Sequence, residues 1–242
     1  TDTAKRILVP EGLFRKGSSR VWMEDHGFFV IQVEFQPSGF AKGTYLNVGI
    51  SFLFDYAGDL NSTLAFNIGG RVLEFTEYQD DDTFRREMER YAEIAKEKVL
   101  EFRQFENVDY ARKVLHDRVK RIDTSRFCWD MYELAMVNFL TGRFAEGKEM
   151  LEMTISALDN NYYWGRHNVK WLSEVYDFCI VECLPQCVNI ESARAMGEKM
   201  VNRRRQFFMS KASFRKMNGL FSVSDFVLYA ISFMVSMVSF NG

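Results

Sequence analysis

The chain has little of the material from which disulfide scaffolds and disordered linkers are built. Only three of its 242 residues are proline, which argues against a long disordered linker and for extensive helix in the second half. Its four cysteines are too thinly spread for a disulfide scaffold, so we infer a reducing, cytoplasmic location. No signal-like apolar stretch follows Thr1, but an initiator Met is also missing, which leaves the removal of a leader open.

An excess of charge of either sign is also missing. The formal net charge is -2, which gives no global reason to expect nucleic acid or an anionic membrane as a partner. Hydrophobic residues at 47% and charged residues at 26% are typical of a soluble globular protein long enough for one large domain or two small ones. Aromatic residues are abundant at 15%, which predicts bulky packing in the core.

Recognised catalytic motifs are absent from the sequence. None of His26, His116 and His167 stands at a motif spacing from a Ser, Cys or carboxylate, so neither a catalytic triad nor H-E-x-x-H is visible. Gly69-Gly70 does not form a phosphate-binding loop. We therefore assign no catalytic residue, no metal ligand and no cofactor.

The clearest pattern lies between residues 28 and 56, where two runs alternate with a period of two around a turn-rich segment. This pattern predicts an antiparallel pair of strands with one apolar and one polar face. Because a sheet must cover its apolar face, we expect the rest of the chain to pack against it. The apolar face would consist of Phe29, Ile31, Val33, Phe35, Leu46, Val48, Ile50, Phe52 and Phe54.

Further strands are expected on both sides of this pair. A short strand over residues 20–24 would turn through Asp25-His26-Gly27 into the first long strand. Two short strands joined by a turn at Gly69-Gly70 would follow the pair, which makes about five antiparallel strands in the first 75 residues.

From Asp80 the apolar period changes from two to 3.6. The cluster at residues 80–82 can cap a helix, whose apolar stripe runs from Phe84 to Phe102. Further helices are predicted after Asn107, over 130–142, up to about 160, around 169–183 with an end at Pro185, and over 190–208 after a cap at Asn189. We therefore predict an α+β fold, with a sheet domain over 1–106 and a helical domain over 107–242.

The segment from Leu220 to Phe240 is the most apolar in the chain. Asp225 leaves only 15 residues free of charge, short of the about 20 that a membrane span needs. Ser222 and Asp225 form a capping box, and polar or small residues recur along one side of the predicted helix. We expect a buried core helix here, with a membrane anchor as the alternative.

Two stretches resemble known families. The first stretch contains Phe14, Arg15, Lys16, Trp22, Gln32, Gln36, Asn47 and Gly49. On these positions the first 110 residues or so resemble an uncharacterised bacterial family known only as a domain of unknown function, which implies an α+β fold and no catalytic residues.

The second half contains spacings similar to one tetratricopeptide repeat, a helical hairpin typical of protein-binding scaffolds. No second copy follows at a period of 34, and Met131, Thr154 and Asp159 depart from the repeat pattern. The matching positions are Leu134, Ala135, Gly142, Phe144, Gly147 and Leu151.

Three other clusters have a functional and a structural interpretation. Cys179, Cys183 and Cys187 could share a metal, but they continue an apolar stripe and fit a core better. The run at 80–82 could hold a cation, although a helix cap is the commoner role. The basic run at 203–205 could bind RNA, but nearby glutamates favour a solvated or intramolecular ion-pairing face.

The polar face of the predicted strand pair is the leading candidate for a binding site. Its side chains would meet across the strands and line a shallow groove of hydrogen-bond donors and acceptors. An ordinary solvent-facing surface is the alternative. The candidate residues are Gln32, Glu34, Gln36, Tyr45, Asn47 and Ser51.

The leading functional hypothesis is a non-catalytic protein-interaction or ligand-binding module of the adaptor or immunity type. We expect another protein as its partner, and neither nucleic acid nor a membrane. One alternative is a metal-assisted hydrolase with a site near His26 or His167, assembled from scattered residues. The other is a peripheral membrane protein attached through the basic segment and the apolar tail.

Overall fold

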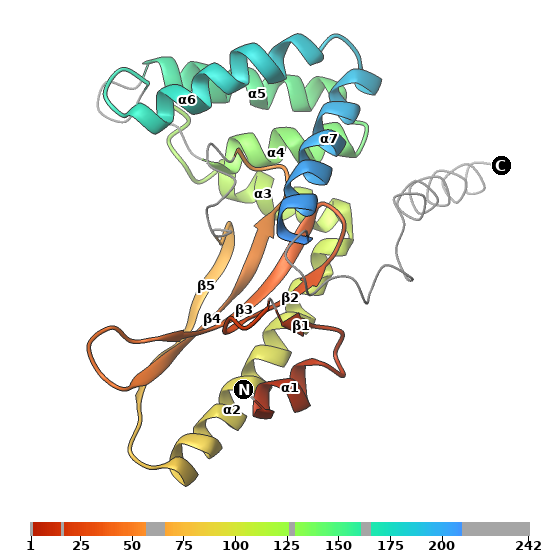
Figure 1. Ribbon diagram of the computed structural model, residues 1–242. Helices are drawn as coiled ribbons and strands as arrows, with labels where there is room; N and C mark the ends of the chain where they lie inside the picture. Colours follow the sequence, from red (N-terminus) through yellow and green to blue (C-terminus); the bar gives the residue numbers. More distant parts are fainter. Residues whose placement is uncertain (1, 16, 57–65, 126–128, 161–165, 210–242) are drawn as a thin grey trace, which may run out of the picture.

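The computed structural model describes residues 2–15, 17–56, 66–125, 129–160 and 166–209 (Figure 1). It has the predicted α+β architecture, in which one antiparallel sheet lies against α1 and α2 and a layer of helices stands beyond one end of the sheet. The strands are β1 (Phe14–Arg15), β2 (Val21–Asp25), β3 (Phe29–Pro37), β4 (Gly43–Phe52) and β5 (Ile68–Glu77). The helices are α1 (Asp2–Leu8), α2 (Asp81–Phe102), α3 (Val108–Val119), α4 (Trp129–Leu140), α5 (Phe144–Asn160), α6 (Lys170–Phe178) and α7 (Ile190–Met209).

The predicted pairing of the two long strands is confirmed. Phe29 of β3 lies opposite Phe52 of β4, and Glu34 lies opposite Asn47, so the two alternating patterns face as expected. The five strands follow one another in the order β1-β2-β3-β4-β5. Each strand therefore pairs with its neighbour in the chain, which is the simplest antiparallel connection.

The predicted turn at Gly69-Gly70 is wrong, because both glycines lie inside β5. Gly69 pairs with Gly49 of β4, and a Cβ atom on Gly69 would lie 2.5 Å from the carbonyl oxygen of Val48. Glycine is needed here for close approach of two backbones rather than for a turn. The sheet reaches five strands through β1, which no sequence pattern indicated. Residues 57–65, before β5, lie outside the described part.

Helix α2 covers the apolar face of the sheet, as the 3.6-residue period predicts. Its cap is confirmed, since Asp80 Oδ1 accepts a hydrogen bond of 2.8 Å from the Thr83 amide, which lowers the pKa of that carboxyl. Tyr91, on the buried side of α2, is inaccessible to solvent and donates its hydroxyl to the Glu74 carbonyl of β5 at 2.7 Å. The helix is thus fastened to the edge strand as well as packed against the centre of the sheet.

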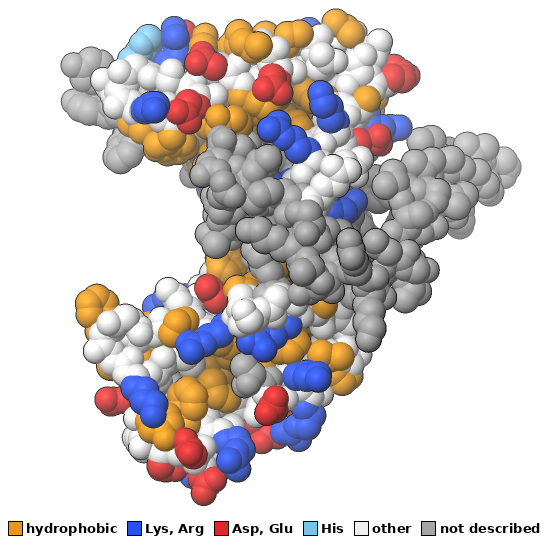
Figure 2. All heavy atoms as spheres, in the orientation of Figure 1, with side chains coloured by type: hydrophobic (Ala, Val, Ile, Leu, Met, Phe, Trp, Pro, Cys, Tyr) orange, Lys and Arg blue, Asp and Glu red, His pale blue; other side chains and the backbone are white. Residues whose placement is uncertain are grey.

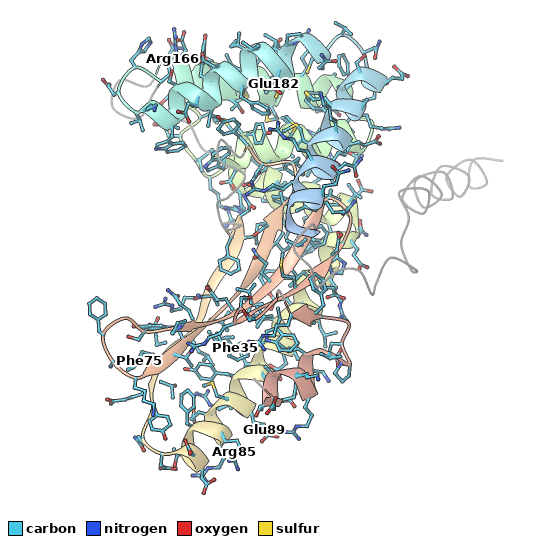
Figure 3. All side chains as sticks on the ribbon, viewed as in Figure 1. Phe35, Phe75, Arg85, Glu89, Arg166 and Glu182 are labelled. Atoms are coloured by element: carbon cyan, nitrogen blue, oxygen red, sulfur yellow. The ribbon has the colours of Figure 1, made fainter. Side chains whose placement is uncertain are left out.

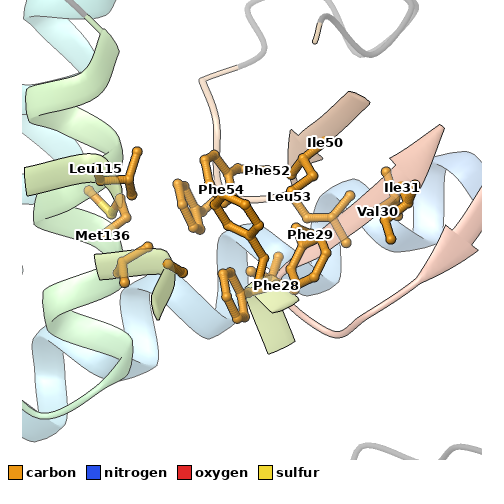
Figure 4. Packing of buried hydrophobic residues seen from close by; sticks show 14 of the residues in the cluster. Phe28, Phe29, Val30, Ile31, Ile50, Phe52, Leu53, Phe54, Leu115 and Met136 are labelled. Atoms are coloured by element: carbon orange, nitrogen blue, oxygen red, sulfur yellow. The ribbon is translucent and has the colours of Figure 1, made fainter. Parts of the chain in front are cut away.

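A second part of the core joins the end of the sheet to the helical layer. The rings of Phe28, Phe52 and Phe54 stack with centroid separations of 5.0 to 6.4 Å, and Leu115 of α3 and Met136 of α4 face them (Figure 4). One hydrophobic cluster contains residues of both halves. The division into domains at residues 106 and 107 stays a prediction.

The helical layer contains the predicted hairpin of α4 and α5. The chain turns between them at Gly142, whose φ is 82°, a conformation that favours glycine. Gly147 lies against the ring of Phe139, where an added Cβ would come within 2.6 Å of the ring carbons. The absence of a side chain at Gly147 therefore allows α4 and α5 to pack closely. The resemblance to a tetratricopeptide repeat stays a prediction.

Predicted caps and breaks also hold in this layer. Asn107 caps α3 and Asn189 caps α7 through their side-chain oxygens. After α6 the chain continues as a π-helical turn (Cys179–Cys183) and ends in a 3-10 turn that contains Pro185. The predicted helix at residues 220–240 lies outside the described residues. Among the described helices, none combines the length and the apolarity that a membrane span needs.

Strand β5 forms one edge of the sheet and pairs irregularly with β4. Leu46 lies opposite Leu73 while the next residue, Asn47, lies opposite Arg71, so Val72 is an extra residue on β5. A second irregularity follows between the pairs Leu46–Leu73 and Thr44–Thr76. Each such bulge twists the strand and interrupts its regular row of hydrogen-bonding groups.

Candidate functional site

The structure brings the six predicted binding residues onto one face of the sheet, opposite the face covered by α2. In the β3–β4 register, Gln32 lies opposite Gly49, Glu34 opposite Asn47 and Gln36 opposite Tyr45. The exposure of these side chains varies along the face. The side chains of Gln32, Asn47 and Ser51 are buried, whereas Glu34, Gln36 and Tyr45 are partly exposed.

These side chains bond mainly to one another. Asn47 Nδ2 donates to Glu34 Oε2 and to Gln36 Oε1, both at 2.9 Å. Arg71 of β5, which the sequence analysis missed, donates to Asn47 Oδ1 and Gln36 Oε1 and lies 3.9 Å above the ring of Tyr45. The network therefore forms a platform whose centre, Asn47, is hydrogen-bonded and whose rim is partly exposed.

Asn47 is the centre of this platform, which leads to a stability prediction. Asn47→Ala removes the hydrogen bonds to Glu34, Gln36 and Arg71, and we expect it to lower the free energy of unfolding by about 1–3 kcal/mol. Chemical denaturation monitored by circular dichroism measures the change. Glu97→Gln, at an exposed position outside this network, serves as the control and should change the free energy of unfolding by no more than about 0.5 kcal/mol.

The loop between β3 and β4 projects beyond the platform, at the left of Figure 1, and displays a fully exposed Phe40. The backbone of the loop is held in place, because Ser38 Oγ accepts from the amides of Phe40 and Ala41 at 3.1 and 3.3 Å. The Tyr78 amide donates to the Lys42 carbonyl at 2.7 Å. An exposed aromatic ring on a fixed loop loses little conformational entropy when it binds.

Other aromatic and cationic side chains lie next to this loop. Lys42 Nζ lies 3.2 Å from the centre of the Tyr78 ring, and the ring of Phe75 packs beside Tyr45 with centroids 5.3 Å apart. Figure 3 shows Phe75 at the hairpin end of the sheet, far from Glu182 and Arg166 of the helical layer. Figure 2 shows that the lower part of the molecule in this view carries apolar side chains set among both basic and acidic ones. We call Phe40, Lys42, Tyr45, Arg71, Phe75 and Tyr78 the hairpin surface.

A separate cluster of polar groups lies between the sheet and the helices. Asn67 Nδ2 donates both to Asp55 Oδ2 at 2.5 Å and to Glu133 Oε1 at 2.7 Å. Glu133, on α4, is only 1% exposed. Arg118 of α3 donates to the Asn67 carbonyl at 3.0 Å and lies 2.8 Å from the carboxylate of Asp130.

Burial dominates the electrostatics of this cluster. It raises the pKa of Asp55 to about 7, against the opposing effects of the Asn67 hydrogen bond and the charge of Arg204. Burial and the charge of Asp55 also raise the pKa of Glu133 well above its usual range. At a pH between the ordinary carboxyl pKa of the unfolded chain and the raised pKa of the folded state, these two groups therefore keep a proton that the unfolded chain has released.

The three histidines lie in different environments. His26 is buried, with Nδ1 2.6 Å from Glu106 and Nε2 3.2 Å from Glu24, and its ring stacks on Phe29. Burial alone would raise the pKa of Glu24, but hydrogen bonds from His26 and Arg103 lower it overall. His116 and His167 are exposed.

The cysteines and the basic run follow their structural interpretations. Cys179, Cys183 and Cys187 are buried free thiols. The hydrogen bond with Cys179 and burial raise the pKa of Cys183, and burial raises the pKa of Cys187. Within the described ranges, no group of three or more His, Cys, Asp or Glu side chains could hold a metal ion. Arg205, at the end of α7, makes two hydrogen bonds to the carboxylate of Asp25, at 2.8 and 3.0 Å, as an intramolecular role predicts.

Comparison of the chain with protein-family models, with curated proteins and with solved structures found no significant match. Function must therefore be inferred from the chemistry of the surfaces themselves. The resemblance of the first 110 residues to a domain of unknown function stays a prediction.

Proposed function

We propose that this protein is a non-catalytic protein-interaction module that binds its partner through the hairpin surface. The observation that carries the proposal is the fully exposed Phe40 on a loop whose backbone is fixed by hydrogen bonds. Aromatic and arginine side chains dominate the binding energy of many protein interfaces, and the hairpin surface combines both. The partner would offer an apolar pocket for the Phe40 ring.

The platform behind the loop supports this role. Asn47, Gln36 and Arg71 hold one another in place, so the exposed faces of Tyr45 and Arg71 are already ordered before a partner arrives. The proposal includes a reducing, cytoplasmic compartment, which suits the three buried free thiols. An adaptor or immunity protein is the kind of molecule that such a surface would serve.

Site-specific photocrosslinking tests the proposal. With p-benzoylphenylalanine in place of Phe40, we expect a discrete adduct in the native cell extract that excess unlabelled protein suppresses and excess Phe40→Ser protein does not. Val188, an exposed apolar residue of the helical layer, is the matched control position and should give no such adduct. The proposal fails if both positions give the same adducts, or if Phe40→Ser competes as well as the natural protein.

The same variant supplies a stability prediction. Because the Phe40 side chain is fully exposed, Phe40→Ser should change the free energy of unfolding by no more than about 0.5 kcal/mol. Urea denaturation measures this quantity. A large loss of stability would mean that Phe40 packs within the protein, which would remove the reason for assigning it to a partner.

A further inference from the structure

The cluster around Asn67 joins the sheet to three helices of the layer above it. Asp55 follows β4, Asn67 precedes β5, and Glu133 and Asp130 lie on α4. The remaining members, Arg118 on α3 and Arg204 on α7, bring positive charge. Three carboxyl groups thus face two guanidinium groups, so that one bound proton makes the cluster electrically neutral.

The orientation of Asn67 is determined by the backbone. Its side-chain oxygen accepts a hydrogen bond of 2.8 Å from the Phe52 amide, so its nitrogen must point toward the two carboxyl groups. The amide nitrogen occupies the position between Asp55 and Glu133 that a cation would need. This amide can neutralise neither carboxylate, since it carries no net charge.

The second oxygen of each carboxyl group is also buried. Within the part of the chain that the structure describes, Asp55 Oδ1 and Glu133 Oε2 have no hydrogen-bond partner. A buried carboxylate oxygen without a donor is costly, whereas a protonated carboxyl group carries no charge to desolvate. The geometry therefore favours a cluster that holds a proton.

We propose that Asp55, Asn67 and Glu133 form a pH-sensitive joint, which fastens the sheet to the helical layer when protonated and loosens when the proton leaves. Ionisation would place two negative charges on either side of one neutral amide in a buried site. Arg118 forms its ion pair with Asp130, so its positive charge offsets the negative charge of Glu133 only in part. Repulsion between Asp55 and Glu133 would then separate α4 from the ends of β4 and β5.

The other titratable groups facing the joint do not supply the same response. Tyr132 of α4 is buried, and its hydroxyl donates to the Phe54 carbonyl at 2.8 Å. Burial raises its pKa well above the usual range, and the pKa of Cys183 beside it is raised as well, so both stay uncharged near neutral pH. Cys179, Asp130 and the two arginines complete the surroundings of the joint.

Amide hydrogen exchange of the full chain at pH 6 and pH 8, corrected for intrinsic exchange rates, tests the proposal. Because the folded-state pKa of Asp55 is about 7, protection of α4 and of the start of β5 should fall about tenfold between these two pH values. The first half of helix α2, at the end of the sheet away from the helical layer (Figure 1), is the internal reference and should lose less protection. Glu133→Gln, which removes one of the two charges that repel each other, should diminish the difference, whereas the exposed Glu97→Gln should preserve it.

Three outcomes would overturn the proposal. One is equal protection of α4 at the two pH values in the natural protein. Another is an undiminished pH response in Glu133→Gln, or in Asp55→Asn if the first variant does not fold. The third is an equal loss of protection in the first half of α2 and in α4, because the proton would then act on the whole fold and not on a joint.

Discussion

Gly69→Ala is expected to lower the free energy of unfolding by about 2–5 kcal/mol. The φ angle of Gly69 is 89°, a conformation that costs energy for any residue with a Cβ atom. An added Cβ would also lie 2.5 Å from the Val48 carbonyl oxygen and 2.8 Å from the Cα of Gly49. Both atoms belong to the backbone of β4, so relief requires the two strands to move apart.

Two other glycines make this prediction specific. Gly70 also has a positive φ, of 138°, but no atom lies within 4 Å of an added Cβ, so Gly70→Ala reports the cost of the conformation alone. Gly39 has neither constraint, and its substitution should be close to neutral. Urea midpoints of the three variants measure the difference. If Gly69→Ala is no worse than Gly70→Ala, the close approach of the two strands does not constrain the sheet.

Asn67→Leu is the second substitution with a large expected effect, a loss of about 3–5 kcal/mol at pH 7. Leucine fills a similar volume but leaves the Phe52 amide, Asp55 and Glu133 without the hydrogen bonds that Asn67 provides. The two buried carboxyl groups would then face each other across an apolar side chain. Calorimetry or denaturant unfolding gives the loss directly.

Asn67→Asp separates the two functions of this side chain. Aspartate keeps an acceptor for the Phe52 amide but replaces the donor by a third carboxyl group beside Asp55 and Glu133. The stability of this variant should therefore fall more steeply from pH 5 to pH 8 than that of the natural protein. The sign follows because carboxyl groups whose pKa is raised on folding lose their favourable contribution as the pH rises toward the folded-state pKa. Equal slopes for the two proteins would contradict it.

Local periodicity was sufficient to predict the central sheet pair and the helix that covers it. The alternation along β3 and β4 determined which residues share a face of the sheet, and Glu34 and Asn47, which the structure pairs, both lie on the predicted polar face. The same reasoning failed at Gly69-Gly70, where a pair of glycines has two physical uses, a turn or a close contact. Because of that error, Arg71 was not recognised as a neighbour of Asn47.

The buried joint could not be predicted in the same way, because its members are brought together only by the fold. Asn67 and Glu133 are 66 residues apart, and neither belongs to a recognisable motif. Glu133 lies in a helix whose other residues are largely apolar and buried. A carboxyl group within such a helix is the one local signal that could have indicated an unusual environment.

The hairpin surface was only partly predictable. Tyr45 belongs to the alternating pattern, but the exposure of Phe40 depends on the turn geometry that Ser38 imposes. An aromatic residue in a short loop can equally fold back onto a core, and the sequence does not distinguish the two cases. The fixed loop is what makes its exposure informative.

The two margins of the sheet limit how this protein can assemble with copies of itself. Within the described ranges, β1 at one margin contains two residues, and β5 at the other is interrupted by two bulges. Neither offers the long, straight template that fibril growth and strand exchange between molecules require. We therefore expect concentrated solutions to resist cross-β aggregation through either of these two margins.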